Sequence, residues 1–69
     1  MTFYYITYRY VPGGSKQYLT VDTPTKESAK IYLALKVFEG HVLTLGAKEA
    51  RKIAMSAVCN VESVDFIDG

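Results

Sequence analysis

The sequence predicts a small α+β domain in which two helices cover one face of an antiparallel or mixed sheet, in the order ββα(β)αβ. Two patterns support this fold class. Residues 2–10, 17–22 and 61–67 alternate between apolar and polar side chains, as strands do, whereas residues 24–38 and 47–58 repeat apolar side chains at helical spacing. With 69 residues, the chain is expected to form one domain spanning residues 1–69.

A segment rich in Gly and Pro at residues 11–16 predicts a hairpin loop between the first two strands. If the turn is centred between Gly13 and Gly14, Tyr8 pairs with Leu19, and Arg9 pairs with Tyr18. Side chains alternate between the two faces of a strand, so the hairpin separates into two sets. The predicted core set is Tyr4, Ile6, Tyr8, Leu19 and Val21. The predicted outward set is Tyr5, Thr7, Arg9, Tyr18, Thr20 and Asp22.

The first helix is expected to begin with Thr23 as its N-cap and Pro24 at its first position. Gly40 is placed to end it, shortly after Phe38. Its main apolar face is predicted to carry Ile31, Ala34, Leu35 and Phe38, and a second strip to carry Leu33 and Val37. A helix with two apolar strips is expected to pack on two sides.

Residues 42–45 are apolar and too few to assign by period. They form either a short third strand, which we favour, or the lead-in to a helix capped by Thr44. The second helix is predicted to bury a stripe of mostly small side chains, namely Ala50, Ile53, Ala54, Ala57 and Val58. The closing strand is predicted to point Val64 and Phe66 inward.

No catalytic or metal-binding constellation is present, so we expect a protein that is not an enzyme and takes no cofactor. His41, expected in a surface loop, is the single histidine, and Cys59, expected as a small core residue, is the single cysteine. One of each cannot supply a zinc site. Glu62 and Asp65 would point to opposite faces of a strand, so they are not expected to bind a cation together.

The composition favours a folded cytoplasmic protein. Hydrophobic residues make up 49% and charged residues 22% of the chain, and the net charge is +1. A single cysteine leaves no internal disulfide and favours a reducing compartment. No apolar run approaches the roughly 20 residues that a membrane span needs. Met1 leads directly into a strand pattern, so we expect no signal peptide.

The functional expectation comes from the tyrosines, because five of the six lie on the predicted hairpin. Tyr5, Arg9 and Tyr18 on the outward face, with Lys16 at the loop, form a candidate partner-binding surface, since Tyr and Arg are enriched in binding hot spots. In size and organisation the whole chain resembles small inhibitors encoded by phages and mobile elements, including anti-CRISPR proteins. That resemblance implies a protein-binding inhibitor that blocks a host protein or nucleoprotein complex, acting as a monomer or homodimer.

Two alternatives accompany this expectation. Tyrosines on an open sheet can stack the bases of single-stranded nucleic acid, with lysine and arginine side chains meeting the phosphates. A second contact surface is also available on the second predicted helix. That secondary basic face comprises Lys48, Arg51, Lys52 and Met55.

Overall fold

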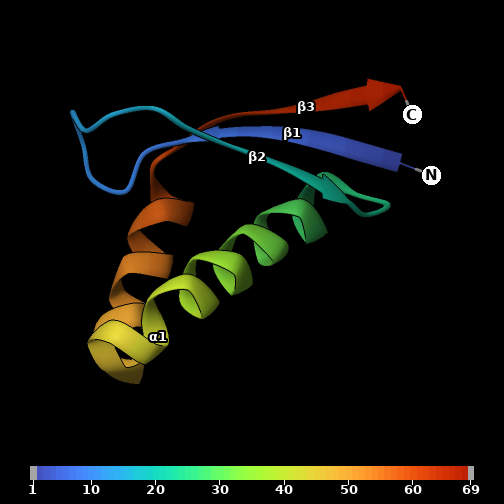
Figure 1. Cartoon of the computed structure of the whole chain (residues 1–69). Helices are drawn as coiled ribbons and strands as arrows, with labels where there is room; N and C mark the ends of the chain where they lie inside the picture. Colours follow the sequence, from blue (N-terminus) through green and yellow to red (C-terminus); the bar gives the residue numbers. More distant parts are fainter. Residues whose placement is uncertain (1, 69) are drawn as a thin grey trace.

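The chain folds as a three-stranded antiparallel sheet with one long helix on one of its faces (Figure 1). The structure, a computed structural model, describes residues 2–68, with the backbone alone for Asp68. The elements are β1 (Thr2–Tyr8), β2 (Gln17–Asp22), α1 (Lys26–Cys59) and β3 (Val61–Asp68). The sheet order is β2-β1-β3, so β1 is the central strand and both neighbours are edge strands. The predicted α+β class is confirmed, and the sheet is antiparallel, one of the two expected arrangements. The predicted pair of helices is wrong, because one long helix is present.

The hairpin register differs from the predicted one by two residues. Tyr8 pairs with Gln17 instead of Leu19, and Tyr18 lies opposite Thr7 instead of Arg9. A displacement of two residues returns every side chain to the same face, so the predicted faces are correct although the partners are wrong. The core set is confirmed in the structure: Ile6, Tyr8 and Val21 are buried, and Tyr4 and Leu19 pack against them.

β3 pairs with the other side of β1, with Val64 opposite Ile6 and an irregularity between Thr7 and Tyr8. Val64 packs against the core as predicted. Phe66 lies edge-on to Tyr4 at a ring-centroid distance of 5.8 Å. It is nevertheless 59% exposed, so its expected burial is wrong. The closing strand thus runs beyond the part of the sheet that the helix covers.

Residues 42–45 belong to α1, so neither a third strand nor a helix ending at Gly40 forms there. Gly46 interrupts the helical geometry with φ 84° and ψ 164°, and the helix turns sharply at this residue. Figure 1 shows two arms that form a V, with the kink at its tip and both arms running from the kink to the sheet. The first arm is residues 26–45 and the second arm is residues 47–59. Two separate helices joined by an extended segment were expected, whereas one kinked helix is present.

The helix begins two residues later than predicted, with Thr25 as its N-cap. The Ser28 backbone N–H donates to Thr25 Oγ1 at 3.1 Å, and the Thr25 N–H donates to Ser28 Oγ at 3.3 Å. This reciprocal pair is a capping box. Thr23, the predicted N-cap, is instead buried, and its hydroxyl donates to Ser28 Oγ at 2.6 Å.

The first arm buries the strip that was predicted to be secondary. Ala29, Leu33 and Val37 lie in the core. Of the predicted main face, Ala34 and Phe38 pack against the core, whereas Ile31 and Leu35 are 61% and 51% exposed. Ala29 has almost no side chain, so it lets the helix approach the sheet closely along this strip. On the second arm, the predicted small stripe is confirmed at Ala50, Ala54 and Ala57, which are all buried.

Candidate protein-binding face

The face of the sheet opposite α1 is open (Figure 1). Strand pairing arranges its side chains in rows that run across β2, β1 and β3. The rows are Tyr18–Thr7–Ser63, Thr20–Tyr5–Asp65 and Asp22–Phe3–Ile67. We call these nine positions the open face. Its aromatic and aliphatic members form a diagonal band from the start of β2 to the end of β3.

Tyr5 and Tyr18 form a stacked pair in this band. Tyr18 lies opposite Thr7, two residues along β1 from Tyr5, so the two rings are diagonal neighbours on one face of the sheet. They stack with centroids 5.5 Å apart and ring planes 18° apart. Tyr5 is 37% and Tyr18 55% exposed. Offset aromatic pairs contribute about 0.5–1.5 kcal/mol beyond buried area, so each ring holds the other in place while both remain accessible.

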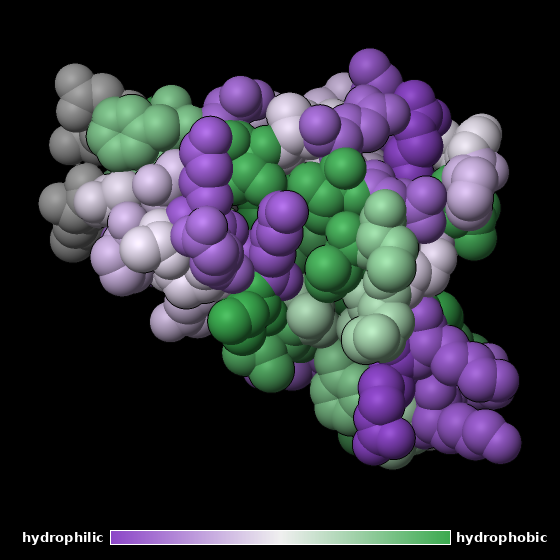
Figure 2. All heavy atoms as spheres, turned by 180° about the vertical axis from the view of Figure 1, so that it is seen from behind, coloured by the Kyte–Doolittle hydropathy of each residue, from purple (hydrophilic) through white to green (hydrophobic). Residues whose placement is uncertain are grey.

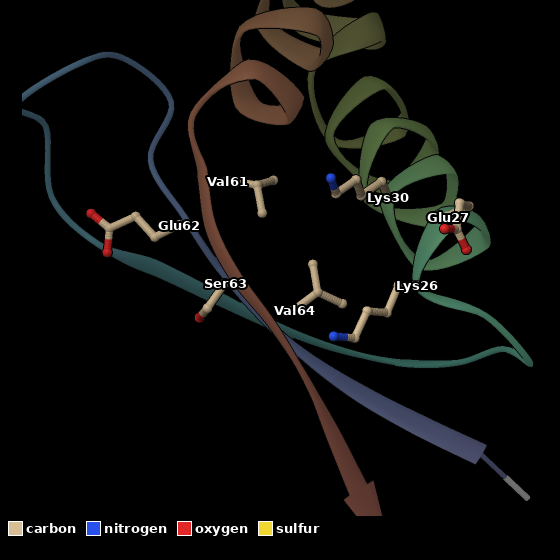
Figure 3. A pocket seen from close by; sticks show the side chains of 7 residues that line it. All are labelled: Lys26, Glu27, Lys30, Val61, Glu62, Ser63 and Val64. Carbon is tan, nitrogen blue, oxygen red and sulfur yellow. The ribbon is translucent and has the colours of Figure 1, made fainter.

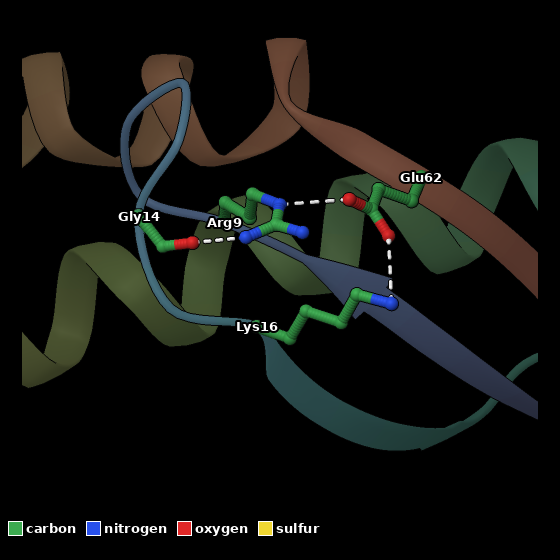
Figure 4. Close-up of polar contacts among 4 residues, drawn as sticks. All are labelled: Arg9, Gly14, Lys16 and Glu62. Carbon is green, nitrogen blue, oxygen red and sulfur yellow. Dashed lines mark hydrogen bonds and ion pairs between the residues drawn. The ribbon is translucent and has the colours of Figure 1, made fainter.

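Arg9 and Lys16 converge on Glu62 at one end of the open face (Figure 4). Arg9 Nε donates to Glu62 Oε1 at 2.7 Å, and another guanidinium N–H donates to the Gly14 carbonyl oxygen. Lys16 Nζ lies 3.8 Å from the other Glu62 oxygen. Hydrogen bonding from Arg9 is the main reason that the pKa of Glu62 lies below its ordinary value. The hairpin loop is therefore tied to β3 by charge-assisted contacts.

Glu62 is a member of the candidate site that the sequence analysis did not predict. Arg9 and Glu62 are 53 residues apart, and they meet only because β3 returns beside β1. Of the four predicted partner-binding residues, Tyr5 and Tyr18 stack on the open face, and Arg9 and Lys16 meet Glu62 at its hairpin end. Tyr5 and Tyr18 are free for contact, whereas Arg9 and Lys16 are already engaged by the unpredicted carboxylate.

The secondary basic face lies on the second arm of α1, in the helical layer, where the sheet separates it from the open face. Its four predicted residues line a hollow of about 400 Å³. Met55 is 63% exposed there, and Lys52 lies 3.6 Å from Glu49. The structure therefore does not bring the basic cluster and the stacked tyrosines onto one surface.

His41 and Cys59 have positions other than those predicted. His41 lies within α1, where its Nδ1 is 2.8 Å from the Val37 carbonyl oxygen and its ring is edge-on to Tyr10 at 5.7 Å. It fastens the first arm to the beginning of the hairpin loop. Cys59 is exposed at the end of α1 and is not a core residue. Within residues 2–68, no three His, Cys, Asp or Glu side chains are grouped to hold a metal ion.

Comparison with protein-family models, curated proteins and solved structures gives no match to this chain. Within the described residues, α1 is insufficiently apolar over any membrane-length window to span a bilayer.

Proposed function

We propose that this chain is a non-catalytic protein-binding module of the cytoplasm and that it binds its partner through the open face. The observation that carries the proposal is the exposed stack of Tyr5 and Tyr18 on a rigid sheet. Tyrosine provides a large contact area with a polar end, and few torsions are lost when it is immobilised. Because each ring already restrains the other, less conformational entropy is lost on binding than for isolated side chains.

The ends of the open face give a binding partner polar groups to recognise. Arg9 is held in position by Glu62 and the Gly14 carbonyl, while the Lys16 side chain is 51% exposed. At a protein interface, an apolar centre surrounded by polar and charged groups is the usual arrangement. A module of this kind acts by covering a surface of its partner, so we extend the proposal to an inhibitor that blocks a host protein or nucleoprotein complex.

Charge favours a protein partner over single-stranded nucleic acid. Asp22 and Asp65 lie on the open face, and Glu62 lies at its end. These carboxylates would repel phosphates close to the stacked rings. Nucleic-acid-binding surfaces normally combine aromatic side chains with a basic patch. The basic residues of the second arm are separated from the rings by the thickness of the sheet.

A site-specific photo-crosslinking experiment tests the proposal. A photoreactive phenylalanine replaces Tyr18 in one sample and Tyr32 in the control, because Tyr32 is 45% exposed on the helical layer. Both proteins are irradiated in bacterial lysate with and without nuclease. The proposal expects a discrete crosslinked protein from position 18 only, and its yield should survive nuclease.

Substitution of the two tyrosine rings makes the test quantitative. Tyr5→Ala with Tyr18→Ala should weaken binding of the crosslinked partner by at least about a hundredfold, the scale of a central hot spot. Tyr32→Ala should leave it unchanged. Circular dichroism of each variant establishes that the fold is retained. Equal binding by the wild type and the double variant would refute the assignment of this face, and loss of the crosslink after nuclease would favour nucleic acid.

A further inference from the structure

A groove of about 310 Å³ lies between the first turns of α1 and the edge strand β3 (Figure 3). Val61 and Val64 line it from the strand side. β3 pairs with β1 along one edge only, and within residues 2–68 nothing pairs with its outer edge. A free edge presents a row of backbone N–H and C=O groups that can pair with another extended chain. Figure 2 shows hydrophobic side chains gathered among hydrophilic ones across the back of the molecule as viewed in Figure 1.

The charges facing this groove are positive. The side chains of Lys26 and Lys30 reach from α1 toward β3 (Figure 3). Glu27 also lines the groove but points away from the strand, and Glu62 points to the opposite side of β3, where it contacts Arg9. Neither Lys26 nor Lys30 forms an ion pair with any side chain that the structure describes. An incoming strand would therefore meet two lysine ammonium groups with no carboxylate between them.

We propose that the outer edge of β3 binds an extended acidic segment of a partner protein, which extends the sheet and places two carboxylates against Lys26 and Lys30. Spacing along the two elements supports this geometry. Four residues along a helix advance about 6 Å, and two residues along a strand advance about 6.6 Å. Lys30 lies beside Val61 and Lys26 beside Val64, three residues further along β3, so the two lysines follow the strand (Figure 3). Their long, flexible side chains cover the difference between two and three strand residues.

The same geometry defines the sequence of the segment. Two acidic residues separated by one residue would lie on the helix side of the incoming strand. Beyond them, toward the end of β3, Phe66 is 59% exposed, so the next position on that side should be apolar. The aliphatic parts of the lysine side chains can cover the strand while their ammonium groups bind the carboxylates. Main-chain hydrogen bonds supply affinity and the alternate side chains supply specificity, as in other cases of strand addition.

The probe is a labelled peptide, Thr-Val-Thr-Glu-Thr-Glu-Thr-Val-Thr, whose palindromic sequence fits either strand direction. Fluorescence anisotropy gives its affinity, and amide chemical shifts of the intact chain locate it. We expect saturable binding, shifts concentrated in β3 and the first turns of α1, and slower hydrogen exchange along β3. Affinity should fall as salt is raised, since exposed charges are screened.

Charge reversal separates this site from the open face. Lys26→Glu with Lys30→Glu should lower affinity by about tenfold or more. It should not unfold the chain, because both side chains are exposed and an acidic residue at the first helical position is favourable. The matched control is Lys36→Glu with Leu43→Glu and Thr44→Glu, at exposed positions of α1, which changes the net charge equally and alters no residue of the groove or of the secondary basic face. The control should bind as the wild type does. Tyr5→Ala with Tyr18→Ala should also bind normally, so this inference can fail without the proposed function failing.

Several results would overturn the proposal. They are the absence of binding at millimolar peptide, equal affinity for a peptide with Lys in place of Glu, and equal affinity for the groove variant. Retained binding by a peptide N-methylated at alternate residues would also contradict strand addition. If a second copy of this chain occupied the edge instead, light scattering would detect a dimer without peptide. The amide chemical shifts of β3 would then depend on the protein concentration.

Discussion

Two glycines in α1 should respond to the same substitution with opposite signs. Gly40 lies within the helix with helical geometry, and an added Cβ would meet no atom within 4 Å. Alanine there should stabilise the fold by about 0.5–1 kcal/mol, because glycine loses more backbone entropy in a helix. Gly46 also has nothing within 4 Å of an added Cβ, but its φ of 84° and ψ of 164° lie in a region that is almost exclusive to glycine. Gly46→Ala should therefore cost about 1–3 kcal/mol from backbone strain alone.

Thermal unfolding followed by circular dichroism measures both effects. In a domain of this size, 1 kcal/mol changes Tm by about 4–8 °C. Gly40→Ala should raise Tm by a few degrees, and Gly46→Ala should lower it by roughly 5–20 °C. Chemical denaturation with an unchanged m value would show that the change lies in stability and not in the extent of unfolding. If Gly40→Ala destabilises the chain, or if Gly46→Ala is neutral, the helix does not continue through Gly40 and turn at Gly46.

Three further predictions follow. Leu33→Val should destabilise the fold by about 1 kcal/mol or more, because Leu33 is fully buried. Leu35→Val should cost little beyond helix propensity, because Leu35 is 51% exposed. Equal losses of stability in urea denaturation would contradict the assigned core. Burial is the main cause that raises the pKa of Tyr8 to about 12, and the folded state therefore holds its proton more tightly than the unfolded state. Stability should fall between about pH 10 and 12, by at most about 3 kcal/mol, and Tyr8→Phe should reduce that loss in denaturation curves across this range. The pKa of Glu62 is lowered mainly by its hydrogen bond from Arg9. The stability that this pair contributes is therefore present near neutral pH and is lost as pH falls through the folded-state pKa of Glu62. Arg9→Ala should raise the pKa of Glu62 in an NMR titration, and an unchanged titration would disprove the pairing.

Alternation in the sequence determined the faces of the sheet. Tyr5 and Tyr18 were predicted to point outward, and Ile6 and Val21 inward, although the register used for that prediction was wrong by two residues. This outcome has a simple physical cause. Side chains repeat every two residues along a strand, so an even displacement changes the partner of each residue but not its face. The tyrosine part of the candidate binding face could therefore be predicted from sequence.

The partners of the charged residues could not be predicted in the same way. The Arg9–Glu62 contact depends on β3 lying beside β1, and the sequence contains no local signal for which strands become neighbours. The groove beside β3 has the same origin, since Lys26 and Val64 are distant in sequence and meet across α1 and the sheet edge. Contacts of this kind are decided by chain topology.

The sequence by itself determined that this chain has amphipathic strands, a strongly helical middle and an outward pair of tyrosines. Tertiary structure decided which helical strip lies in the core, because both strips are apolar in the sequence. The strip with Leu33 and Val37 is buried, whereas the strip with Leu35 only borders the core through Ala34 and Phe38. It also decided where the helix turns. Positions 40 and 46 are both glycine, so residue type alone does not distinguish them. Only packing of the second arm against the core places the positive-φ backbone at Gly46.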